Sequence, residues 1–118
     1  MRNPPRDDRE YVQDILERIQ RIETFVASGR DEFFQSVLIQ DAVMRNFEVI
    51  GEATKRLSHD FREQHPNVPW KQMAGFRDVL IHDYMGLQLE QIWATIEQSL
   101  PTLRQQILEI LQATDPLP

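Results

Sequence analysis

The stretch DDREYVQDILERIQRIETFVAS, residues 7–28, sets apolar side chains three or four positions apart. That spacing places them on one face of an α-helix. The apolar positions are Val12, Ile15, Leu16, Ile19, Ile22, Phe25 and Val26. Asp7 or Asp8 stands where an N-cap residue is expected, and Gly29 is a typical helix stop. The stretch therefore predicts an amphipathic helix over about 7–28.

A second helix is predicted from Asp31 to about Ser58, because the same spacing continues there. Asp31 is suited to cap its first turn. The apolar positions of this segment are Phe34, Val37, Leu38, Ala42, Val43, Phe47, Ile50, Ala53 and Leu57. With only a short turn between them, the first and second helices are expected to form an antiparallel hairpin.

Residues 59–69 are polar and contain two prolines, Pro66 and Pro69. This composition predicts a turn or short helix near 60–64, followed by a loop. A third helix is expected to begin at Pro69–Trp70, because proline suits the first helical turn.

The last helix is predicted to start near Leu89, after a turn marked by Gly86. Pro101 lies inside it and should kink it, because proline lacks one backbone donor. Four amphipathic helices with short connections predict an all-α, up-and-down four-helix bundle. We expect residues 1–118 to form one domain, since the length is typical of one and no repeat or linker is present.

Composition excludes several classes of protein. The absence of cysteine rules out disulfides, thiol nucleophiles and cysteine-bound metals. The N-terminal residues MRNPPRDDRE lack the apolar core of a signal peptide, and no apolar run approaches the ~20 residues of a membrane span. We therefore expect a cytoplasmic protein that does not contact a membrane. The net charge of −6 argues against a protein that coats nucleic acid.

Two of the three histidines, His59 and His65, flank the polar loop. Their spacing of six residues does not match the i, i+4 pair with which a helix holds a metal ion. We interpret both as solvated loop residues and predict no metal site.

The third histidine lies in a segment of different character, RDVLIHDY, residues 77–84. Histidine is the usual proton-transfer residue near neutral pH. Four polar, reactive side chains, Arg77, Asp78, His82 and Tyr84, surround the apolar residues Val79–Ile81. The pattern alone favours a helix with a buried stripe and surface ion pairs, such as Arg77 with Asp83.

Helical geometry separates the two candidate side chains of this segment. Arg77 and His82 are five residues apart, which is about 140° around an ideal helix. A site that uses both requires either that the helix ends or distorts before His82, or that a second copy of the chain completes the site.

The stretch WKQMAGFRDVLIHDY, residues 70–84, resembles the HepT-like toxins of the HEPN ribonuclease superfamily. The signature of that family is arginine, four residues, histidine, any residue and tyrosine, which Arg77, His82 and Tyr84 match in full. The resemblance also extends to residues 41–53 (DAVMRNFEVIGEA), 92–93 and 100–103. It thus covers most of the chain.

The resemblance implies a homodimeric, metal-independent endoribonuclease with no cofactor and with its cleft at the dimer interface. It also implies the toxin of a type VII HEPN/MNT toxin–antitoxin pair. The partner would be an MntA-like minimal nucleotidyltransferase antitoxin, which silences the toxin by transferring AMP to the tyrosine at position 84.

The side chains suggest how such an enzyme would cut RNA. His82 is suited to proton transfer, and Arg77 to clamping phosphate oxygens. One histidine cannot easily act on both sides of one phosphate, so a dimer would supply two copies of His82. Asp78 would orient Arg77 or a histidine, or form a surface ion pair. Tyr84 would contact RNA or serve as a core aromatic.

A second hypothesis uses the same residues without chemistry. The chain would be a non-catalytic HEPN helper that binds a nucleotidyltransferase and presents a nucleotide or substrate. Under either hypothesis the net charge of −6 predicts weak long-range steering of RNA, so binding would depend on local contacts.

Overall fold

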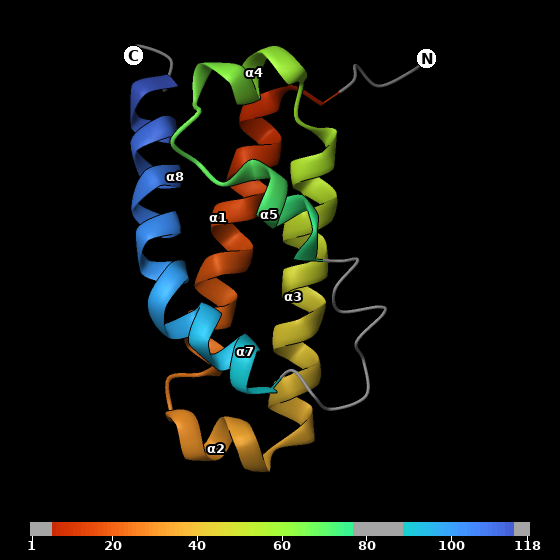
Figure 1. Cartoon of the computed structure of the whole chain (residues 1–118), viewed down its shortest axis with the longest axis vertical. Coiled ribbons are helices and arrows are strands. Elements are labelled where there is room, and N and C mark those ends of the chain that lie inside the picture. The colour runs from red at the N-terminus through yellow and green to blue at the C-terminus, as the bar shows by residue number, and fades with distance from the viewer. Residues whose placement is uncertain (1–5, 77–88, 115–118) are drawn as a thin grey trace.

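Helices make up the regular structure of residues 6–76 and 89–114, the parts of the chain that this computed structural model describes (Figure 1). The three longest run along the length of the molecule: α1 (Asp8–Phe25), α3 (Val37–Arg56) and α8 (Leu100–Thr114). The shorter ones are α2 (Arg30–Gln35), α4 (His59–Gln64), α5 (Trp70–Ala74) and α7 (Leu89–Ala94). The predicted all-α bundle is confirmed.

Helix α1 begins and ends close to where the sequence predicts. Asp7 caps it, since its Oδ1 accepts a hydrogen bond from the backbone N–H of Glu10 at 2.9 Å. The helix ends at Phe25, three residues earlier than expected, and a turn over 26–28 leads to Gly29. Gly29 has a φ of 98°, which a residue with a side chain rarely adopts, so the chain reverses there.

The prediction of one continuous second helix is wrong near its start, because the segment forms two helices separated at Ser36. Ser36 is extended (φ −110°, ψ 107°), and its Oγ accepts from the N–H of Ile39 at 3.1 Å. The side-chain amide of Gln40 donates to the carbonyl oxygens of Phe33 and Phe34, which α2 leaves without helical partners. These bonds stabilise the end of one helix and the start of the next.

The break at Ser36 also changes which apolar side chains face the core. Phe33 is fully buried, whereas Phe34, the residue predicted to face the core, is only partly buried. Val37 and Leu38, predicted as core residues, are 67% and 80% exposed, and Phe25 is 40% exposed. The predicted register was continuous across Ser36, and the observed one is not.

The core lies between α1, α3 and α8 and is closed by α5 and α7. Its fully buried aliphatic side chains come from several helices and include Val12, Ile15, Ile19, Ile22, Val43, Ile50, Met73 and Ile107. One buried amide, Asn46, is satisfied within it: its Nδ2 donates to the Ala42 carbonyl at 2.7 Å, and its Oδ1 accepts from Arg18 at 3.3 Å. At one end, the Asp8 carboxylate accepts from the N–H and Oγ of Ser58, which links the starts of α1 and α4.

The last helix is bent by a π turn, η1 (Thr95–Ser99), between α7 and α8 (Figure 1). The N–H of Leu100 donates to the carbonyl of Thr95, five residues back. This wide turn accommodates Pro101, whose ring in a regular helix would meet the carbonyl of Glu97. The kink predicted at Pro101 is therefore present just before it.

The π turn also aligns the buried faces of α7 and α8. Eight residues of regular helix turn the chain by about 800°, which would leave Ile92 and Leu100 about 80° apart. One extra residue in the π turn offsets about 100° of this rotation, so the two side chains lie within roughly 20° of one face. Both are buried, at 7% and 1% exposure.

Truncation of a core side chain tests this packing. Ile19→Ala should lower the free energy of unfolding by about 2–5 kcal/mol, because Ile19 is fully buried and its loss leaves a cavity. Leu38→Ala is the matched control, since Leu38 is 80% exposed and its truncation should change stability by less than about 0.5 kcal/mol. Urea denaturation followed by circular dichroism measures both, and equal losses would contradict the assignment of the core.

Within the described residues, no helix has the length and apolar character needed to span a membrane.

Candidate functional site

The predicted catalytic residues lie outside the described part of the chain. Arg77, Asp78, His82 and Tyr84 all fall between Phe76 and Leu89, so their predicted roles stay predictions. The structure does describe the residues on either side of this segment. Those flanks show how the bundle holds the chain before and after positions 77–88.

The N-terminal flank is the short helix α5, which packs against α3. The indole Nε1 of Trp70 donates to the carbonyl of His65 at 2.9 Å, and the Met73 side chain is fully buried. The ring of Phe76 meets that of Phe47 edge to face, with centroids 5.1 Å apart. The residue that precedes Arg77 is therefore packed against the α3 helix.

The C-terminal flank is α7, which packs at the end of the bundle that α2 occupies (Figure 1). Ile92 is buried, and the ring of Trp93 lies 5.4 Å from that of Phe33. On the surface, the guanidinium of Arg30 contacts the Glu90 carboxylate at 2.7 Å. The guanidinium of Arg30 also lies 4.3 Å from the centre of the Phe34 ring. The residues that precede and follow positions 77–88 are thus attached to the same core.

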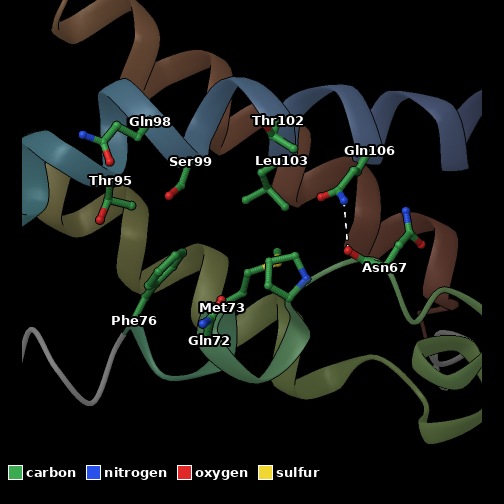
Figure 2. Close-up of a pocket in the computed structure, with 11 residues that line it drawn as sticks. Asn67, Gln72, Met73, Phe76, Thr95, Gln98, Ser99, Thr102, Leu103 and Gln106 are labelled. Carbon is green, nitrogen blue, oxygen red and sulfur yellow. Dashed lines mark hydrogen bonds between the residues drawn. The ribbon is translucent and has the colours of Figure 1, made fainter.

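A groove with a volume of about 580 Å³ opens between α5 and the η1–α8 helix (Figure 2). Its volume is within the range of small-ligand pockets. The apolar part of its lining consists of Pro69, Met73, Phe76 and Leu103, of which Met73 and Leu103 are buried. Phe76 is both a wall of this groove and the residue next to Arg77 in the chain.

In the part of the chain that the structure describes, the remaining walls of the groove carry amides and hydroxyls but no charged side chain. The amides are those of Asn67, Gln72, Gln98 and Gln106. The hydroxyls are those of Thr95, Ser99 and Thr102, which follow one another along one face of η1 and α8. Gln106 donates from its Nε2 to the Asn67 carbonyl at 2.9 Å, which connects the two walls at one end (Figure 2).

The sequence-based prediction missed this groove because none of its residues forms a recognised motif. Most of its polar side chains lie on one face of η1 and α8, where glutamine and threonine are common. One signal was present: uncharged residues recur at helical spacing over Thr95, Gln98, Thr102 and Gln106, in a chain with 27% charged residues.

The two other histidines take structural or surface positions. His59 lies on α4 rather than in a loop, and its Nε2 is 2.8 Å from the Glu63 carboxylate at the surface. His65 is half-buried, and its ring lies 4.7 Å from that of Phe61. Over residues 6–76 and 89–114, no three His, Asp or Glu side chains form a cluster that could hold a metal ion.

Comparison with known proteins places most of the chain in one group of relatives. Residues 15–110 match the family described as "Ribonuclease HepT-like". A Thermococcus cleftensis protein named "Probable ribonuclease HepT" is 40% identical over 100 residues, which are 84% of this chain and 91% of that protein. A Caldanaerobacter subterraneus protein named "Putative RNase" is 42% identical over 105 residues, 88% of this chain and 94% of that protein.

The name of a longer relative gives a second activity besides ribonuclease. The Methanocaldococcus jannaschii protein named "Gamma-glutamylcyclotransferase and putative RNase" is 40% identical over 111 residues. Those residues are 93% of this chain but 50% of that protein, so the chain spans about half its length. No solved structure is significantly similar to the chain.

Proposed function

This chain belongs to the HepT-like ribonuclease family, and from that membership we propose that it is a metal-independent endoribonuclease. It acts as the toxin of a HEPN/MNT toxin–antitoxin pair. The observation that carries the proposal is the complete Arg-x4-His-x-Tyr signature of Arg77, His82 and Tyr84, in a chain that matches the family over residues 15–110.

The residues on either side of the signature segment support this proposal. Phe76 packs on Phe47 of α3, directly before Arg77, and Ile92 is buried soon after the motif. A catalytic segment needs such attachment, because catalytic groups must be held to within about 0.5 Å of a productive geometry. The same two attachments would also serve a site that a second protomer completes.

The proposed reaction needs three tasks at one phosphate. A base removes the proton of the 2′-OH, whose oxygen then attacks phosphorus, and an acid protonates the departing 5′-oxygen. We assign both proton transfers to His82 of two protomers in a homodimer, and the stabilisation of charge on the phosphate oxygens to Arg77. Asp78 orients one of these groups. The products are a 2′,3′-cyclic phosphate and a free 5′-hydroxyl.

The proposed partner is an MntA-like nucleotidyltransferase that transfers AMP from ATP to the hydroxyl of Tyr84, with release of pyrophosphate. Tyr84 is two residues from His82 in the chain. The adduct adds bulk and negative charge where an RNA phosphate would otherwise sit. This combination of repulsion and obstruction accounts for silencing of the toxin.

Replacement of Arg77 tests the proposed function. Purified, unmodified protein should cleave RNA in the presence of EDTA, and Arg77→Ala should cleave it about 10²–10³ times more slowly, as expected when one donor to the transition state is lost. Cleavage of total RNA, with chemical analysis of the new ends, measures both.

Arg45→Ala is the matched control for this variant. Arg45 is exposed on α3 and pairs with Glu48 at 3.1 Å, so its loss should leave cleavage unchanged. If the wild-type protein cleaves no RNA but still binds a nucleotidyltransferase, the chain is a non-catalytic helper and the proposed activity is wrong.

A further inference from the structure

The groove between α5 and the η1–α8 helix has no role in the proposed proton transfers. Its position, size and chemistry nevertheless fit one part of an RNA chain. We propose that this groove binds a single unpaired nucleobase of the RNA substrate, close to the phosphate that is cut, and thereby gives the enzyme a base preference. This inference rests on the proposed ribonuclease function and adds a specificity site to it.

The side chains of the described lining suit a neutral occupant better than a phosphate. Among the residues that the structure describes, every side chain that lines the groove is neutral, whereas phosphate sites use arginine, lysine or a helix N-terminus. A neutral ligand with several donors and acceptors fits this lining better. Nucleobases are the neutral parts of RNA that carry such groups.

The amides of the lining suit the edges of bases. Gln72 on α5 and Gln98 on η1 are exposed and lie on opposite walls, so each can offer an amide N–H and a carbonyl to a ligand between them (Figure 2). Asparagine and glutamine form paired hydrogen bonds with base edges in nucleic-acid complexes. Thr95 and Ser99 add hydroxyls on the same wall as Gln98.

The apolar wall suits the face of a base. Phe76 is half-buried, which leaves part of its ring accessible, and Met73 and Leu103 continue the apolar surface behind it. Unpaired RNA bases are commonly recognised by stacking on an aromatic side chain while their edges are hydrogen-bonded. The groove provides both kinds of contact within one site of about 580 Å³.

The connectivity of the chain relates this groove to the cleavage site. Phe76 lines the groove and is joined by one peptide bond to Arg77, the proposed phosphate clamp. Consecutive Cα atoms are about 3.8 Å apart, which is less than the length of a nucleotide. A base in the groove would therefore belong to a nucleotide near the phosphate that Arg77 holds.

The test measures binding without cleavage. Four 2′-O-methyl octanucleotides, one for each base, are titrated into isotope-labelled protein and followed by NMR. They cannot be cut, because the attacking 2′-oxygen is methylated. We expect one octamer to bind roughly 5- to 150-fold more tightly than the weakest one, the range for one paired amide–base contact. The side-chain amide signals of Gln72 and Gln98 should shift in that titration.

A matched pair of variants assigns the preference to the groove. Gln98→Leu should reduce the difference between octamers to less than about 2-fold, because it removes one amide from the lining. Gln105→Leu makes the same change on α8 outside the groove, where Gln105 donates to Glu109 at 3.2 Å, and should keep the preference. Circular dichroism checks that both variants are folded.

The outcomes separate this inference from the proposed function. Equal binding of the four octamers, no binding, or shifts confined to other surfaces would each overturn the base site, whether or not the protein cleaves RNA. Selective binding by a protein that cleaves no RNA would keep the base site and refute the catalytic proposal.

Discussion

His82→Ala is expected to slow RNA cleavage by at least about 10²–10⁴-fold and to abolish growth arrest in cells that express the protein. The reason is that proton transfer by a positioned histidine contributes an acceleration of this order, and the motif contains no other residue suited to it near neutral pH. In a homodimer the change removes both the base and the acid, so the loss should lie at the upper end of this range. Single-turnover cleavage of an end-labelled RNA measures the rate.

The chain supplies a closely matched control for this variant. His59 lies on the exposed surface of α4, where it pairs with Glu63 at 2.8 Å. Surface pairs of this kind contribute at most about 1 kcal/mol to stability, so His59→Ala should fold and cleave like the wild type. Wild-type cleavage by a folded His82→Ala protein would refute the assignment of His82, and equal losses in both variants would point to a general defect.

Incubation with the cognate nucleotidyltransferase and ATP is expected to add AMP to the wild-type protein and to silence its cleavage activity. Tyr84→Phe should gain no AMP and keep cleaving in the same mixture, because phenylalanine has no hydroxyl to accept the nucleotide. The effect is all or none, which makes intact-protein mass spectrometry and a cleavage assay sufficient to measure it.

Tyr11→Phe is the control, since the chain has only 2 tyrosines. Tyr11 lies on α1, and the guanidinium of Arg6 is 4.8 Å from its ring centre. This variant should be modified and silenced like the wild type. If Tyr11→Phe escapes modification and Tyr84→Phe does not, the modified residue is Tyr11. If neither of the two variants nor the wild-type protein gains AMP, the proposed pairing with a nucleotidyltransferase is wrong.

The helices were predictable where one regular stripe continues through an element. On α1 the predicted positions Val12, Ile15, Ile19 and Ile22 are fully buried and Leu16 is partly buried, because no break changes the register. The interruption at Ser36 was not predictable from spacing. The apolar residues on both sides of it, Phe33, Phe34, Val37 and Leu38, fit a continuous helix as well as a broken one. Only the bonds made by the side chains of Ser36 and Gln40 distinguish the two.

For the candidate site, the motif residues could be predicted and the groove could not. The identity of Arg77, His82 and Tyr84 as a set came from the resemblance to a family, because an arginine and a histidine five residues apart do not share a helix face. The groove beside them brings Asn67 and Gln72 together with Gln98 and Gln106, about thirty residues away in the chain. Such a site depends on how α5, which packs on α3, lies opposite the last helix, and no local pattern encodes that arrangement.

The π turn before Pro101 has a consequence for how relatives of this chain should be aligned. It holds one residue more than a regular helical turn, and that residue keeps Ile92 and Leu100 on one buried face. A relative with a regular helix here could bury the same two positions only if it were one residue shorter between them. A single-residue gap between these two positions would then record a change of helix geometry, and the residues of the groove on either side of it would need to be matched separately.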